Sequence, residues 1–109
     1  MSDVDAVRSA DVPDGARLLD VREAYEFTAG HAPGALHIPV DEIPSRFEDE
    51  LDPDADYHVI CRTGGRSAQI TQWLTAQGYS VIFVLDGMDG WLESGRPLEC
   101  ASGEEPRVL

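Results

Sequence analysis

The sequence contains no lysine and few positive charges of any kind. All 8 basic residues are arginine, against 21 acidic residues, which gives a net charge of −13. A nucleic acid needs a basic protein face to offset its phosphates, so we expect no nucleic-acid partner. The acidity is compatible with a GC-rich genome, which we favour, and also with adaptation to high salt.

The sequence also lacks long apolar runs. None approaches the length that crosses a bilayer, and residues 1–5 show no basic segment followed by an apolar one. We therefore expect no membrane contact and a cytoplasmic location. The 109 residues suit one domain with a single core, over residues 1–100. The polar segment 101–109 has little to pack, and we expect it to be flexible.

Cysteine is scarce as well. The two cysteines, Cys61 and Cys100, could form one disulfide, but Cys61 is placed for chemistry and Cys100 lies in a polar segment. Reduced thiols are therefore the better interpretation. The three histidines, His31, His37 and His58, lack metal-site spacing with either cysteine. We expect no metal and no other cofactor.

One heptapeptide is the most informative segment of the chain. Its members are Cys61, Arg62, Thr63, Gly64, Gly65, Arg66 and Ser67. The glycines let the backbone curl, so that successive amides form an anion-binding concavity, and a following helix adds its positive end. Two arginines supply further positive charge, and such surroundings favour a thiolate. We predict that Cys61 is a nucleophile rather than a small buried apolar residue, which is the usual role of a free cysteine.

Apolar periodicity and turn residues divide the chain into alternating elements. The pattern predicts strands over residues 16–21, 36–39, 57–60 and 79–85, and helices over residues 23–29, 40–51, 67–77 and 88–94. This alternation indicates an α/β fold, with a parallel sheet and helices on both faces. The segment 79–85 is continuously β-branched and aromatic, so we expect a strand buried on both faces.

Ligands of parallel sheets gather beyond the carboxyl ends of the strands. Asp20 and Cys61 both stand at such ends. Asp20 is therefore a candidate neighbour of the site, although an ion pair with Arg22 or a capping bond explains it equally well. Trp73 and Trp91 stand at helical spacing among apolar residues, and we expect both in the core.

With these residues in view, the chain resembles a single-domain rhodanese, of the thiosulfate sulfurtransferase family, across nearly its whole length. Three groups of residues carry the resemblance in the family's order: 19–23, 26–27 and 30–35 resemble its first signature, 61–67 its active-site loop, and 78–79, 85–87 and 90–91 its closing signature. Many relatives have Ser and Asn where this chain has Thr63 and Gly65, and a second glycine where it has Asp86. The resemblance implies a rhodanese-like fold with a five-stranded parallel sheet.

The resemblance also implies a sulfurtransferase without a cofactor. Cys61 would take the outer sulfur of a small anionic donor such as thiosulfate, or of a persulfide, and hold it as a persulfide on the amides of residues 62–67. A thiol, which can belong to a protein, or cyanide would then accept the sulfur. Arg66, with Arg62 as the second candidate, would orient the donor, and Asp20 and Arg22 would support the site.

Two alternatives remain open at this level. A rhodanese-like module that only binds a partner, or relays sulfur inside a complex, would show the same signatures, although the intact cysteine and loop speak against an inert module. The related phosphatases and arsenate reductases have a loop that is one residue longer than the segment from Cys61 to Arg66. The shorter loop gives a narrower ring of amides, which suits one extra sulfur better than a phosphoryl group.

Overall fold

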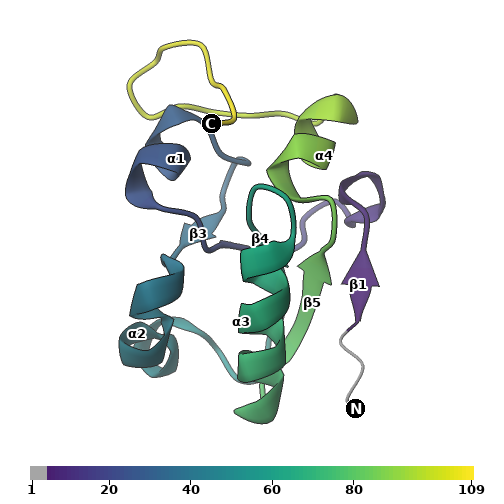
Figure 1. The fold of residues 1–109 in the computed structure, drawn as a ribbon, viewed down its shortest axis with the longest axis vertical. Helices are drawn as coiled ribbons and strands as arrows, with labels where there is room; N and C mark the ends of the chain where they lie inside the picture. The colour runs from purple at the N-terminus through teal and green to yellow at the C-terminus, as the bar shows by residue number, and fades with distance from the viewer. Residues whose placement is uncertain (1–4) are drawn as a thin grey trace.

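A computed structural model describes residues 5–109 of the chain. It contains five strands, β1 (Ala6–Val7), β2 (Leu18–Asp20), β3 (Leu36–His37), β4 (Asp56–Ile60) and β5 (Ser80–Val84). Four α-helices, α1 (Ala24–Ala29), α2 (Ile43–Glu50), α3 (Gly65–Ala76) and α4 (Gly87–Glu93), and two 3₁₀ turns, η1 (Ser9–Asp11) and η2 (Val40–Glu42), connect them (Figure 1). The strands form one sheet in the order β1-β5-β4-β2-β3, and every pairing is parallel. The predicted five-stranded parallel sheet is confirmed.

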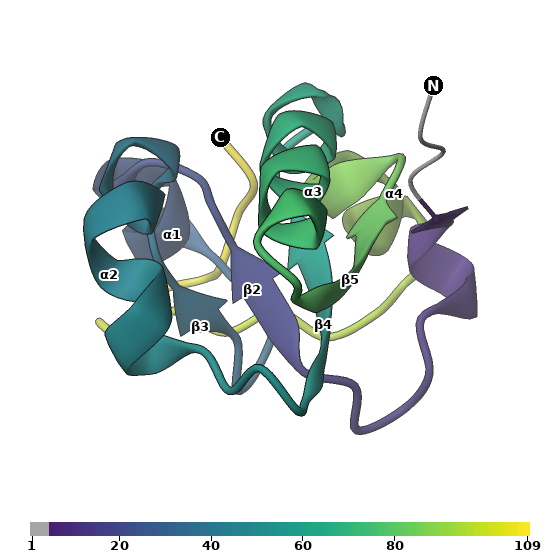
Figure 2. The ribbon, with the colours of Figure 1, turned by 90° about the horizontal axis from the view of Figure 1, so that it is seen from below.

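Side chains alternate across the sheet and build one apolar cluster on each face. Leu19 and Val59 join the cluster that α2 and α3 cover, whereas Leu18 and Ile60 join the cluster that includes Met88 of α4. In Figure 2 the strands β3, β2, β4 and β5 follow one another across the view. The predicted arrangement, with helices on both faces, is therefore correct.

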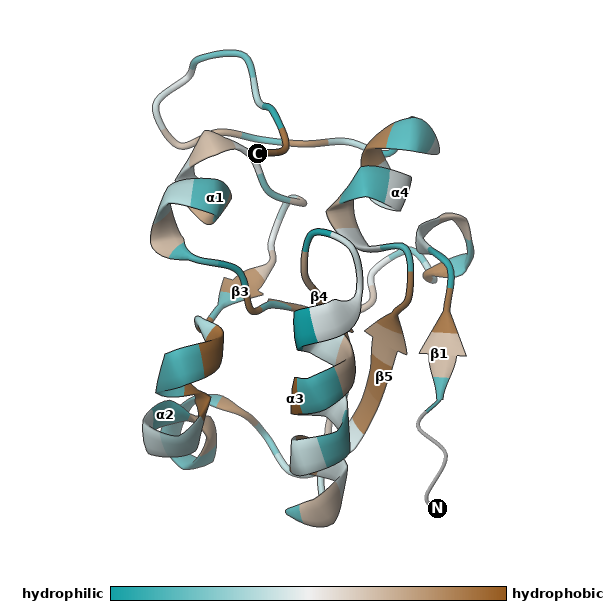
Figure 3. Cartoon of the chain, viewed as in Figure 1, coloured by the Kyte–Doolittle hydropathy of each residue, from teal (hydrophilic) through white to brown (hydrophobic). Residues whose placement is uncertain are grey.

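The amphipathic segment predicted over residues 40–51 becomes η2 followed by α2. Ile43 and Phe47, four residues apart, are buried on the sheet, and Pro44 stands in the first turn, where its missing amide has no helical partner to lose. Figure 3 shows hydrophilic colour over much of α2 and apolar colour along β5. Among the tryptophans, Trp91 is buried as predicted, whereas Trp73 is half-buried and packs edge-on against Phe47.

The prediction that residues 79–85 are buried on both faces is wrong. Ser80, the first residue of β5, is exposed, the next three are partly exposed, and Val84 is the first fully buried one. The cause is the short outer neighbour β1, which pairs only with Phe83 and Val84 and leaves the start of β5 at an edge. Ala6 and Val7 lie between Asp5 and Arg8 and form no apolar run, so the sequence does not indicate β1.

The C-terminal segment 101–109 returns to the domain beside α1 (Figure 1). The Arg107 amide donates a hydrogen bond to the Ala29 carbonyl at 3.0 Å, and Val108 packs against the cluster under α4. The segment thus has more contacts than its polarity suggested, and its flexibility stays a prediction. Within residues 5–109, no helix combines the length and the hydropathy that a membrane crossing requires.

Candidate active site

Cys61 lies at the carboxyl end of β4, inside the loop that leads to α3. The residue is 1% exposed. Its sulfur accepts hydrogen bonds from two loop amides, that of Gly64 at 3.0 Å and that of Ser67 at 3.4 Å. The loop amides therefore surround the Cys61 sulfur, as the glycines and the following helix predicted.

Ser67 completes the polar surroundings of the sulfur. This fully buried hydroxyl lies 3.4 Å from the Cys61 sulfur and donates a hydrogen bond to the Gly64 carbonyl at 3.0 Å. In this arrangement the thiol donates to the Ser67 oxygen. Once the sulfur is ionised, the same hydroxyl can turn to donate to it, because a hydroxyl both donates and accepts.

The double glycine divides two tasks. Gly64 has a φ of 111°, a conformation that side chains disfavour, and a Cβ there would collide with the Leu85 carbonyl. Gly65 begins α3 and has open space around the position of a Cβ. The tight approach of the loop to the end of β5 therefore requires glycine at position 64 alone.

The first turn of α4 holds the loop from its other side. The Met88 amide donates to the Cys61 carbonyl at 2.8 Å, and the Asp89 amide donates to the Arg62 carbonyl at 3.1 Å. Gly87, with a φ of 58°, permits this contact, since a Cβ there would meet the same two carbonyls. Sequence analysis missed this role, although the turn signal Asp86-Gly87 marks its position.

Asp86, one of the three residues at which the chain departs from the resemblance, anchors α4 to η1. Its carboxylate accepts a hydrogen bond from the Ser9 amide at 2.7 Å, and the Ser9 hydroxyl donates to the Gly87 carbonyl at 2.7 Å. The side chain fills the space beside Gly90, where a Cβ would overlap it. Asp86 thus fixes the start of α4, and the amides of α4 fix the Cys61 loop.

The two loop arginines differ in how they are held. Arg62 is 50% exposed and reaches Asp89 at 3.5 Å. Arg66 is 36% exposed and forms a two-pronged ion pair with Glu26 of α1, with nitrogen–oxygen distances of 2.7 and 3.0 Å. Thr63, which stands between Arg62 and Gly64 in the sequence, is exposed.

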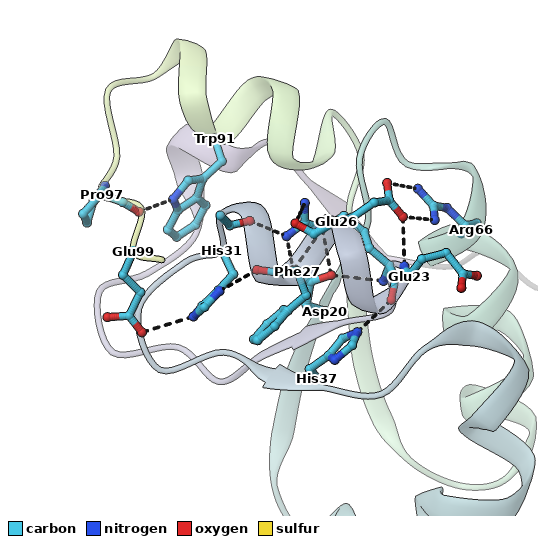
Figure 4. A network of polar contacts seen from close by, with 12 residues as sticks. Asp20, Glu23, Glu26, Phe27, His31, His37, Arg66, Trp91, Pro97 and Glu99 are labelled. Carbon is cyan, nitrogen blue, oxygen red and sulfur yellow. Dashed lines mark hydrogen bonds and ion pairs between the residues drawn. The ribbon is translucent and has the colours of Figure 1, made fainter. Parts of the chain in front are cut away.

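Glu26 is a site residue that sequence analysis did not single out. Its side chain is 5% exposed and also accepts the Glu23 amide at 2.8 Å, which forms the capping box of α1 (Figure 4). The hydrogen bonds from Arg66 lower the pKa of Glu26, against the opposing effect of burial. Glu26 raises the pKa of Arg66, with a smaller contribution from the Cys61 sulfur.

Asp20 and Arg22 form a buried ion pair, one of the two roles considered for Asp20. Both side chains are fully buried, and their closest nitrogen–oxygen distance is 2.8 Å. Arg22 also donates to the Gly30 carbonyl at 2.8 Å and to the Glu26 carbonyl at 3.4 Å. The pair thus holds α1 in place. Its connection to the Cys61 loop is indirect, because Arg22 bonds the backbone of Glu26, and the Glu26 side chain bonds Arg66 of the loop.

Aromatic stacking fixes the same helix from the sheet side. The Phe27 ring lies between His31 and His37, with ring centroids 3.9 and 4.3 Å apart (Figure 4). His31 also bonds the Phe27 carbonyl at 2.8 Å and faces Glu99, just before the C-terminal segment, at 3.3 Å. Within residues 5–109, we find no cluster of three or more His, Cys, Asp or Glu side chains that could bind a metal ion.

Comparison with known proteins matches this arrangement to one family. The model of the Rhodanese-like domain matches residues 4–94. The chain is 40% identical over 80 residues to the putative sulfurtransferase YtwF of Bacillus subtilis, covering 73% of this chain and 77% of that protein. It is 37% identical over 94 residues to the thiosulfate sulfurtransferase GlpE of Actinobacillus succinogenes, covering 85% of this chain and 84% of GlpE. The crystal structure of a rhodanese-related protein from Thermoplasma volcanium superposes with a TM-score of 0.82 at 31% identity, covering 87% of this chain and 97% of that one.

Proposed function

The chain belongs to the rhodanese-like family, and from this membership we propose that it is a sulfurtransferase that carries sulfur as a persulfide on Cys61. The observation that carries the proposal is the buried Cys61 sulfur, which accepts hydrogen bonds from the amides of Gly64 and Ser67. The names of the relatives YtwF and GlpE support the reaction class.

The reaction takes two displacement steps that need no external oxidant or reductant. The Cys61 thiolate attacks the outer sulfur of the donor, a new S–S bond forms, and the donor's S–S bond breaks. Its electron pair leaves with the remainder, which is sulfite from thiosulfate or a thiolate from a persulfide. A thiol or cyanide then attacks the outer sulfur, and Cys61 leaves as a thiolate.

The loop supplies the electrostatic part of this mechanism. Negative charge sits on sulfur before and after each step, so amide donors fixed in advance stabilise it without rearrangement. Helix α3 begins at Gly65, so the amides of its first turn have no acceptor within the helix and point toward the same region. The Asp89 and Met88 amides hold the loop carbonyls from behind, which keeps the loop in this conformation.

The partners in this proposal are a small anionic or persulfide donor and a thiol acceptor, which can be a protein, in the cytoplasm. A sulfur-relay module without free turnover remains the second candidate, since it would use the same Cys61 chemistry. Phosphatase or arsenate reductase activity is less well supported. Both terminal nitrogens of Arg66 are engaged by Glu26, whereas phosphoryl transfer needs a free arginine fork for the transferred group.

The test is a thiosulfate and cyanide assay on the purified protein, run beside an assay with p-nitrophenyl phosphate. We expect thiocyanate formation and no phosphate release. Cys61→Ser should lower the rate to background, whereas Cys100→Ser should keep it, because Cys100 lies outside the loop and donates to the Thr28 carbonyl of α1. Equal loss in both variants would refute the assignment of Cys61 as the single nucleophile.

A further inference from the structure

Each arginine beside the Cys61 loop is paired with a carboxylate. Arg66 is held by Glu26 of α1, and Arg62 reaches Asp89 of α4. Positive charge that the sequence appeared to offer to a donor is therefore offset within the protein. The backbone hydrogen bonds that the Cys61 sulfur accepts come from the Gly64 and Ser67 amides.

We propose that Glu26 and Asp89 determine donor selectivity, by neutralising Arg66 and Arg62 so that a persulfide of low charge is preferred to a dianion such as thiosulfate. The inference rests on the proposed sulfur transfer through Cys61. It assigns a specificity role to two carboxylates outside the loop.

Glu26 has the geometry of a permanent partner. Its carboxylate is buried, binds both terminal nitrogens of Arg66, and is fixed by the Glu23 amide. Such a fork-on-fork pair occupies one donor on each terminal nitrogen and offsets the charge of the guanidinium. Arg66 directly precedes Ser67, whose amide donates to the Cys61 sulfur, so the ion pair stands beside the sulfur-bonded part of the loop.

Asp89 restrains Arg62 more loosely but from two directions. Its amide binds the Arg62 carbonyl at 3.1 Å, and its carboxylate lies 3.5 Å from the Arg62 guanidinium. The pair is about half exposed, so it contributes little to stability. It still places a negative charge beside the positive one at the entrance of the loop.

The overall charge acts in the same direction as the two pairs. With a net charge of −13, the protein repels a dianion more than a monoanion. That long-range effect is screened over about 8 Å at physiological ionic strength. The ion pairs act at contact distance and are screened less, so they can be tested separately from the net charge.

The experiment measures the single-turnover rate at which Cys61 gains one sulfur, with the intact mass of the protein as the readout. No acceptor is added, so only the first step is measured. The donors are thiosulfate and the monoanionic persulfide of N-acetylcysteine methyl ester, generated in the assay. The variants are Glu26→Gln, which keeps an oxygen for the Glu23 amide, and Asp89→Asn. Glu48→Gln, on an exposed position of α2, is the control that removes the same unit of charge elsewhere.

We expect the wild type to react faster with the persulfide at low salt. Glu26→Gln and Asp89→Asn should each raise the ratio of the thiosulfate rate to the persulfide rate by about threefold, because one added positive charge at about 7 Å in water attracts a dianion twice as strongly as a monoanion. Glu48→Gln should change the ratio by less than about twofold, because its charge is distant and screened.

A ratio that is unchanged in both site variants, or raised equally by Glu48→Gln, would overturn the inference while the sulfur on Cys61 still supports the proposed function. No added sulfur from either donor would instead refute the proposed function. Circular dichroism checks each variant, and Asp89→Asn decides alone if Glu26→Gln does not fold, since the exposed Asp89 pair is not needed for folding.

Discussion

The conformation of Gly64 gives the sharpest test of how the loop is built. Gly64→Ala places a Cβ on a residue with a φ of 111° and drives it into the Leu85 carbonyl. The backbone strain costs roughly 1–2 kcal/mol, and forcing an extra carbon into a packed site adds about 1–3 kcal/mol. We expect the variant to lose about 2–5 kcal/mol of unfolding free energy, with a loss of sulfur uptake because the Gly64 amide moves away from the Cys61 sulfur.

Gly65→Ala is the matched control for stability. The neighbouring glycine has the same chemistry, but it begins α3 with ordinary backbone angles and open space around it. Alanine there should leave the free energy of unfolding unchanged or raise it by up to about 1 kcal/mol. Urea unfolding followed by tryptophan fluorescence compares the two. If Gly64→Ala is as stable as the wild type, or Gly65→Ala loses as much, the close approach to Leu85 does not shape the loop.

Three further predictions concern stability. Asp20→Ala should lower the free energy of unfolding by about 3–5 kcal/mol, since it leaves the Arg22 charge buried without a partner, and urea unfolding checks this. The hydrogen bonds from Arg66 lower the pKa of Glu26, so this pair stabilises the fold at pH values above the unfolded-state pKa of 4.5, and the stabilisation is lost as the pH falls through the lower folded pKa. Glu26→Gln should therefore weaken the pH dependence of the free energy of unfolding in that window, and an unchanged pH dependence would contradict the pairing. Burial lowers the pKa of His58, with Asp56 opposing, so stability should fall as pH drops below 6.5 toward the folded pKa; His58→Gln should weaken this dependence, and an identical slope in both proteins would show that His58 is not its source.

The parallel sheet was predictable because its signals are local. The segments that form β2, β3, β4 and β5 are apolar and lie between turn residues. Because helices alternate with these strands, the strands are expected to run parallel in one sheet. The strand β1 was not predictable, since Ala6 and Val7 stand between charged residues, whereas the equally short β3 continues into the apolar Ile38. The exposure of Ser80 follows from that same short neighbour.

The sulfur-binding loop was also predictable, and its supports were not. Glycines, the cysteine and the helix start are adjacent in sequence, so the curl of amides around Cys61 follows from local chemistry. The partner of Arg66 is Glu26, 40 positions earlier, and no spacing rule joins them. Only the tertiary fold brings α1 and the start of α3 close enough for this ion pair, and Arg22 and Asp20 hold α1 in its place.

The anchoring of the loop by α4 belongs to the same class. Gly87 marks a turn in the sequence, but its need for a small residue arises from the Cys61 and Arg62 carbonyls that it approaches. The role of Asp86 likewise depends on Ser9, at the other end of the chain. Turn signals locate such residues, and tertiary contacts decide what they do.

The most direct test of the central claim is intact mass combined with peptide mapping after exposure to a sulfur donor. We expect one added sulfur, located on Cys61, which cyanide removes with release of one equivalent of thiocyanate. An added sulfur on Cys100, or an unchanged mass with both thiosulfate and the alkyl persulfide, would contradict it.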